Sequence, residues 1–163
     1  MVQLTLIAQA APVIPPALPE GFITRELRPG DADRLGRLYF DAHAGTAHGE
    51  VGEAIEEMRQ AFQGEFGELW PEASALVQHE GALVAAIMTV SRAPWPDTPD
   101  CPFITDLFTD HRYRRRGIAR VLVTRCLALA SGTSRPQVAL RVESENEPAV
   151  RLYESLGFRP APS

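Results

Sequence analysis

The spacing of apolar residues changes along the chain between a period of two, typical of β-strands, and a period near 3.6, typical of helices. Alternating or continuous apolar stretches predict strands at residues 2–7, 22–27, 75–78, 82–92, 103–109 and 138–142. Helical spacing predicts helices that span about residues 31–42, 51–63, 118–131 and 146–156. The segment 82–90 is apolar except for Thr89, so we expect a central strand covered on both faces.

Turn-forming residues mark where these elements end. The tripeptide His79-Glu80-Gly81 separates two strands as a hairpin turn, and Gly132 follows the third helix. Residues 8–21 are rich in proline and show little periodicity, which predicts an extended linker. We therefore divide the chain into an N-terminal strand with a proline-rich linker, residues 1–21, and a domain of residues 22–163.

The order of the predicted elements indicates the class of fold. After the linker come a strand, two helices, three consecutive strands, and then helix, strand, helix and a short strand. This order predicts an α/β (α+β) fold in which a mixed sheet packs against helices. A chain of 163 residues with 45% hydrophobic and 23% charged residues is long enough to bury one core.

Charge and composition exclude several classes of function. A net charge of -5 argues against general nucleic-acid binding, which requires a basic surface. All 16 basic residues are arginines, which excludes a Schiff-base or P-loop lysine. No apolar run reaches the roughly 18 residues that span a bilayer, and the N-terminus lacks a basic signal-peptide start, so we expect a cytoplasmic protein without a membrane partner. Cys101 and Cys126 suggest neither a disulfide framework nor a metal site.

An arginine-rich loop that ends at Gly117 joins the strand at 103–109 to the next helix. A helix start offers unpaired backbone N–H groups and the positive end of the macrodipole, and glycine lets an anion approach the backbone. The junction is therefore suited to bind a pyrophosphate, with the small Ala119 leaving the first helical turn open. Three alternatives remain, namely a solvated basic face, an RNA-binding or nuclear-localisation run, and an ordinary turn. The surrounding arginines are Arg112, Arg114, Arg115, Arg116 and Arg120.

Two motifs resemble those of one enzyme family. The pattern Arg114-x-x-Gly117-x-Ala119, after a predicted strand, resembles the acyl-CoA signature of the GCN5-related N-acetyltransferase (GNAT) family. The run from Leu140 through Asn146 and Tyr153 to Phe158 resembles that family's second motif. Both occur in the family's order and separation, over roughly residues 23–158. The resemblance implies a mixed, mostly antiparallel sheet of six to seven strands with helices on both faces.

The resemblance also implies a co-substrate, acetyl-CoA, and no metal. Its pantetheine arm would lie along Leu107, Phe108 and Thr109, where a backbone N–H near Phe108 would donate to the thioester carbonyl. Asn146 would contact the amide arm or merely cap the last helix. The pyrophosphate would lie on the backbone of Arg114, Arg115, Arg116, Gly117, Ile118 and Ala119.

Two side chains are candidates for the proton movements of acetyl transfer. An amine with a pKa near 10.4 is neutral only about once in a few thousand molecules at pH 7, so a base assists. Asp106 is the candidate base, with Glu143 on the neighbouring strand as its rival, and either carboxylate has a structural alternative. Tyr153 lies where many members of the family have the general acid, and its alternative role is packing on an apolar helix face.

The sequence departs from the family pattern at three places. His111 stands where proline is common, and Arg115 stands where a second glycine is common, which makes the loop stiffer and more basic. After Phe158 only five residues remain, and two of them are prolines, which argues against a further C-terminal strand. We expect residues 2–7 to supply the missing strand, either within the chain or exchanged in a homodimer.

The sequence therefore favours an acetyl-CoA-dependent N-acetyltransferase that moves an acetyl group to the primary amine of a small molecule or peptide by direct attack. The alternative is an acyl-CoA-binding sensor without turnover, which the retention of Tyr153 disfavours. A nucleotide or RNA site on another α/β fold is weaker, because the dinucleotide glycine motif is absent. His43 and His48 suit substrate contacts better than a metal site, and Trp95 suits a cover for the sheet.

Overall fold

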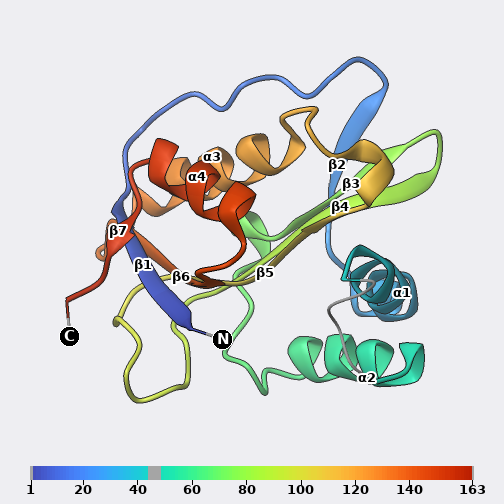
Figure 1. Ribbon diagram of the computed structural model, residues 1–163, viewed down its shortest axis with the longest axis horizontal. Coiled ribbons are helices and arrows are strands. Elements are labelled where there is room, and N and C mark those ends of the chain that lie inside the picture. Colours follow the sequence, from blue (N-terminus) through green and yellow to red (C-terminus); the bar gives the residue numbers. More distant parts are fainter. Residues whose placement is uncertain (1, 44–48, 163) are drawn as a thin grey trace.

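A computed structural model describes residues 2–43 and 49–162. In this part of the chain, seven strands form one mixed sheet in the order β2-β3-β4-β5-β6-β1-β7 (Figure 1). The strands are β1 (Gln3–Gln9), β2 (Phe22–Glu26), β3 (Ala75–His79), β4 (Ala82–Val90), β5 (Phe103–Thr109), β6 (Gln137–Glu143) and β7 (Arg159–Pro160). The helices are α1 (Ala32–Ala42), α2 (Val51–Phe62), α3 (Ile118–Ala130) and α4 (Glu147–Ser155).

The local sequence patterns specify these elements closely. Each predicted strand and helix is present, and its ends lie within two residues of the prediction. The hairpin between β3 and β4 turns at Glu80 and Gly81, whose φ angles of 51° and 81° are both left-handed, as a tight hairpin turn requires. All residues of β4 from Val84 onwards are buried, which confirms that this strand is central.

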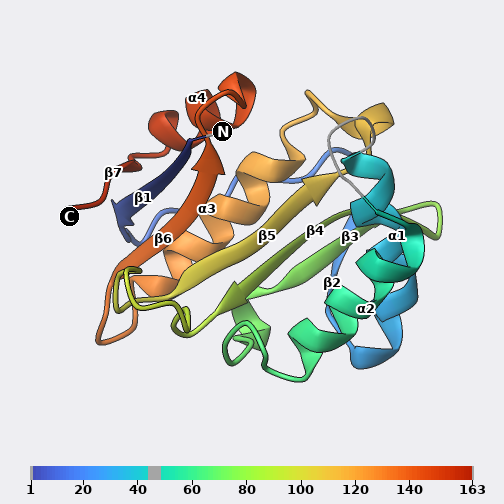
Figure 2. The ribbon, with the colours of Figure 1, turned by 60° about the horizontal axis from the view of Figure 1, so that its bottom comes forward.

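Helices cover both faces of the sheet, as predicted. Figures 1 and 2 show α1 and α2 on one face and α3 and α4 on the other. Under α1 and α2, Leu35 and Met58 pack on Met88 of β4 and Phe108 of β5. A larger cluster under α3 and α4 includes Phe158, which is completely buried after the end of α4.

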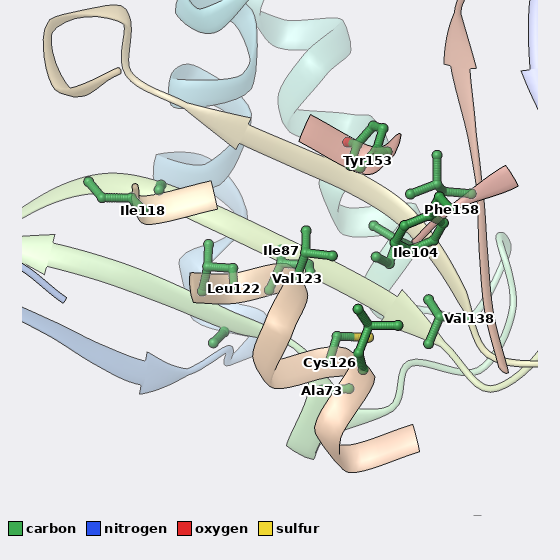
Figure 3. Close-up of a cluster of buried hydrophobic side chains, with 14 of the residues drawn as sticks. Ala73, Ile87, Ile104, Ile118, Leu122, Val123, Cys126, Val138, Tyr153 and Phe158 are labelled. Carbon is green, nitrogen blue, oxygen red and sulfur yellow. The ribbon is translucent and has the colours of Figure 1, made fainter. Parts of the chain in front are cut away.

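The helix α3 is the most deeply buried of the four. Ile118, Leu122 and Cys126 recur along the side that faces the sheet, at the spacing of successive helical turns (Figure 3). Their burial fixes the position and direction of the helix. The start of α3, and the loop before it, are therefore held in a defined place relative to β5.

The N-terminal strand completes the sheet within the same chain. β1 runs antiparallel to β6 from the pair Gln3↔Glu143 to the pair Gln9↔Gln137. The expected absence of a C-terminal strand is wrong, because Arg159 and Pro160 pair with Ile7 and Leu6 of β1. A proline is tolerated there because β7 is a two-residue strand at the outer edge of the sheet. Pro160 has no backbone N–H, and an edge strand does not need that N–H for a further strand.

Candidate active site

The strands β5 and β6 pair only at one end and then separate. Their parallel register consists of Phe103↔Ala139 and Ile104↔Leu140, although β5 continues to Thr109. On its other side β5 remains paired with β4, where Met88 is opposite Asp106 and Thr89 is opposite Ile104. This register leaves Thr105 as the extra residue of a bulge, and a bulge bends the strand that contains it. On the side of β6, the backbone of β5 beyond Ile104 therefore has no strand partner.

The loop that follows β5 ends in an open backbone site. Gly117 precedes α3 with a left-handed φ of 79°. Apart from Gly117 and its two chain neighbours, no heavy atom of the described residues lies within 4 Å of the point where a Cβ at this position would stand. The first backbone N–H groups of α3 need partners from outside the helix. The main chain here is therefore open on the side of Gly117, and its free N–H groups have the geometry that can accept an anion.

Arg115 also has a left-handed backbone, with a φ of 64°. Glycine, which adopts a left-handed backbone at little cost, is common at this position in the family that the loop resembles. A non-glycine residue in this region is disfavoured by about 1–2 kcal/mol. The shape of the loop is therefore imposed by the contacts around it rather than by the intrinsic preference of Arg115.

Asp110 supplies several of these contacts. Its buried carboxylate accepts hydrogen bonds from the backbone N–H of Arg112 at 2.9 Å and from the Arg112 side chain at 2.8 Å. Its own backbone N–H donates to the carbonyl of Val84 at 2.8 Å. The guanidinium of Arg112 lowers the pKa of the Asp110 carboxyl group, so this group is ionised at neutral pH. In the sequence, Asp110 directly follows a strand, and an aspartate at such a position commonly caps the turn that comes next.

Two further arginines of the loop make contacts within the protein, one with α1 and one inside the loop. Arg114 donates to the carbonyl of Ala42, the last residue of α1, at 2.8 Å. The guanidinium of Arg116 lies over the ring of Tyr113, 5.0 Å from its centroid. Arg114 therefore holds the loop against α1, and Arg116 packs within the loop itself. Among the residues that the structure describes, Arg115 has no ion pair, so its charge remains available to a ligand.

Asp106 lies on the face of the sheet under α1 and α2. Burial and the nearby negative charge of Glu57 on α2 raise the pKa of its carboxyl group to about 7, against a smaller lowering by a hydrogen bond to Thr105. Burial, with the charges of Asp106 and Glu57, also raises the pKa of Tyr39 on α1 to about 12. Asp106 is thus a carboxyl group poised to exchange a proton near neutral pH.

Tyr153 approaches the sheet from the opposite face. It belongs to the cluster under α3 and α4, and its ring meets the edge of Phe158 at a centroid distance of 5.7 Å (Figure 3). Burial raises the pKa of the phenol to about 12, so it keeps its proton over the physiological range. Asp106 and Tyr153 therefore lie on opposite faces of the sheet.

The other predicted site residues have simpler surroundings. The Asn146 side chain accepts a hydrogen bond from the backbone N–H of Ala149 and so caps α4. Glu143 is exposed at the end of β6. The Nδ1 of His43 is 2.8 Å from the carbonyl oxygen of Tyr39, whereas His48 lies outside the described residues.

Two negative findings apply to the described residues. Their helices include none with both the length and the apolar character needed to cross a bilayer. In the same part of the chain, no three His, Cys, Asp or Glu side chains are grouped closely enough to bind a metal ion.

Solved structures share this architecture. The GCN5-related N-acetyltransferase from Sphaerobacter thermophilus superposes with a TM-score of 0.68 at 22% identity, covering 98% of this chain and 48% of that one. The aminoglycoside N-acetyltransferase AAC(6')-Iy in complex with CoA gives 0.67 at 15% identity, covering 93% of this chain and 95% of that one. At such low identity the likeness shows the fold alone, which is that of the N-acetyltransferases.

Sequence comparison identifies the family. The profile of the acetyltransferase (GNAT) family matches residues 38–158, and the chain belongs to this family. A mycothiol acetyltransferase from Thermobispora bispora is 34% identical over 152 residues, which cover 90% of this chain and 50% of the relative. The N-alpha-acetyltransferase MAK3 of Arabidopsis thaliana is 30% identical over 129 residues, or 76% and 67% of the two chains. The chain thus spans about half the length of the mycothiol acetyltransferases that it matches.

Proposed function

We propose that the protein is an acetyl-CoA-dependent N-acetyltransferase whose acceptor is a primary amine of a small molecule or peptide. The observation that carries this proposal is the open, left-handed backbone at Gly117, placed at the start of α3 and beside the unpaired part of β5. Membership of the GNAT family supports it. The names of the relatives, mycothiol acetyltransferase and N-alpha-acetyltransferase, support acceptors of both kinds.

The chain has suitable groups along the whole length of such a co-substrate. The backbone N–H groups between Arg114 and Ala119 would hold the pyrophosphate, with the Arg115 side chain adding positive charge. The free edge of β5 at Leu107, Phe108 and Thr109 would hydrogen-bond the pantetheine arm, and Asn146 would face that arm from α4. When bound, acetyl-CoA supplies the acetyl group as a thioester.

Asp106 is the proposed general base. Because its pKa is about 7, a large fraction of the carboxyl group is ionised at neutral pH and can accept a proton from the acceptor ammonium group. The freed amine nitrogen would form a bond to the acetyl carbon as the carbon–sulfur bond breaks, and the second proton that the nitrogen then loses balances the proton that the departing thiolate takes up. A backbone N–H of β5 near Phe108 would stabilise the negative charge that develops on the carbonyl oxygen.

Tyr153 is the proposed proton donor to the departing sulfur. Its phenol remains protonated at neutral pH, which a donor requires, although a pKa of about 12 makes full transfer to a thiolate unfavourable. A hydrogen bond from the phenol already stabilises the thiolate as it forms. The packing of the ring against Phe158 fixes its orientation, so the catalytic and structural roles are compatible.

The test compares two glycines that share one conformation. Gly117 and Gly81 have φ angles of 79° and 81°, and a Cβ at either position has open space around it. Valine at each position introduces similar backbone strain, but only Gly117→Val places a side chain in the proposed phosphate site. We expect Gly117→Val to weaken CoA binding by at least tenfold in calorimetry and to abolish thiol release from acetyl-CoA with a panel of amines. Equal CoA affinity in the two variants would contradict the proposal.

A further inference from the structure

A small hollow lies where β5 and β6 separate. It encloses about 260 Å³ and is lined by Gln3, Trp95, Phe103, Ile104, Thr105 and Arg141. Thr105 is the bulged residue of β5 and immediately precedes Asp106. The hollow is therefore next to the proposed base, and its size suits part of a small organic molecule.

Arg141 carries the charge of this hollow, because the other lining residues are neutral. Its neighbours Leu140 and Val142 belong to the cluster under α3 and α4. Side chains alternate along a strand, so Arg141 lies on the opposite face of the sheet, which is the face of Asp106. The site thus presents a positive group and a negative group on one face of two adjacent strands.

The contacts that Arg141 makes within the chain are weak ones. Its guanidinium is 3.2 Å from a carboxylate oxygen of Asp97, whose side chain is 83% exposed. It also lies over the ring of Trp95, 5.7 Å from the centroid, and its Nε is 3.4 Å from the hydroxyl of Thr5. An ion pair with so exposed a partner contributes little, so a carboxylate from a ligand can replace Asp97 easily.

We propose that this hollow binds a carboxylate of the acceptor, and that the acceptor carries a primary amine and a carboxylate in one molecule. The inference rests on the proposed acetyltransferase function. The amine lies at Asp106, and the carboxylate accepts paired hydrogen bonds from Arg141, whose planar guanidinium matches its geometry. The Trp95 ring offers an apolar surface to the intervening carbon chain. A polyamine is disfavoured, because its second cation would lie against Arg141.

The experiment uses pairs of acceptors that differ only in the carboxylate. Thiol release from acetyl-CoA is measured with glycine, β-alanine, γ-aminobutyrate and δ-aminovalerate, and with the amide of each. We expect at least one acid to have a lower KM than its amide. Arg141→Gln should raise the KM of that acid by roughly ten- to a hundredfold and leave the KM of the amide unchanged, as for loss of a charged hydrogen bond.

Asp97, the partner of Arg141 in the ion pair, provides the matched control. Asp97→Asn removes the internal competitor for Arg141, so we expect it to lower the KM of the acid. If the ion pair were merely structural, both variants would impair the enzyme in the same direction, and that result would overturn the inference. Equal KM values for every acid and its amide would overturn it as well.

A binding measurement separates this inference from the proposed function. Thermal-shift titration with the same acids and amides requires no turnover. Stabilisation by an acid, but not by its amide, that is lost in Arg141→Gln supports the carboxylate site even if no amine is acetylated. Turnover that is indifferent to the carboxylate, with no such stabilisation, rejects the inference and leaves the acetyltransferase function intact.

Discussion

The aspartates of this chain show how their surroundings decide what one residue type can do. Asp31 bonds to the guanidinium of Arg25 at 2.7 Å, and Asp110 bonds to Arg112, so the pKa of each carboxyl group is lowered and both remain ionised. Asp106 instead is half-buried near Glu57, and desolvation together with the negative charge of Glu57 raises its pKa to about 7. Of these three groups, only Asp106 can both accept and release a proton at neutral pH.

The charge of Glu57 provides a test of this role. Because Glu57 raises the pKa of Asp106, we expect Glu57→Gln to lower that pKa. The base is active when ionised, so the acidic limb of the profile of kcat/KM against pH should lie near pH 7 in the parent protein. In Glu57→Gln this limb should move to lower pH. Steady-state kinetics between pH 5 and 9 would measure the shift.

Glu56 is the matched control for this prediction. It is the neighbouring residue on α2, and its carboxylate lies 3.6 Å from the guanidinium of Arg59. It does not contribute to the pKa of Asp106, so Glu56→Gln should leave the acidic limb in place. An identical shift in both variants would mean that the profile reports the general charge of α2 rather than a specific pair.

At the scale of elements, the loop between β5 and α3 depends on Asp110. We expect Asp110→Ala to weaken CoA binding several-fold, because it removes the hydrogen bonds that shape the loop before Gly117. Asp110→Asn should have a smaller effect, since an amide oxygen can still accept from the backbone of Arg112. Calorimetric titration with CoA would rank the three proteins.

Asp100→Ala controls for the loss of a surface carboxylate. Asp100 forms ion pairs with Arg92 and Arg135 at 3.4 and 3.2 Å, but it is in a different loop. Its replacement should leave CoA affinity unchanged.

The lowered pKa of Asp110 also decides how its contribution to folding stability changes with pH. Its stabilising contribution is present above the pKa of the unfolded chain and is lost as the pH falls through the lower pKa of the folded state.

The elements themselves were predictable, because long segments such as β4 and α3 follow strong local periodicities. The open glycine at the start of α3 was also predictable, because glycine is the residue type that readily adopts a left-handed backbone. The partners of individual arginines were not, because Arg114 reaches the end of α1, 72 positions away in the sequence. The pairing of the short β7 was not predicted either, since it depends on the edge that β1 offers.

At the scale of the whole molecule, β1 is an integral strand that lies between β6 and β7. Leu6 on this strand is 3% exposed, whereas Val2 beside it is 61% exposed. We expect Leu6→Ala to lower the free energy of unfolding by about 2–5 kcal/mol, and Val2→Ala to change it by less than about 0.5 kcal/mol. Urea denaturation would measure both. Equal small effects would show that β1 adds little to the stability of the sheet.

The position of β1 also has a consequence for the order of assembly. The linker at residues 10–21 carries the chain from β1 to β2 at the other side of the sheet (Figure 1). Gln3 pairs with Glu143, so β1 waits for a partner that the ribosome makes 140 positions later. Such distant pairing is slow to form, because a long loop must close first. The wall that Gln3 contributes to the small hollow is therefore among the last parts of the protein to fold after synthesis.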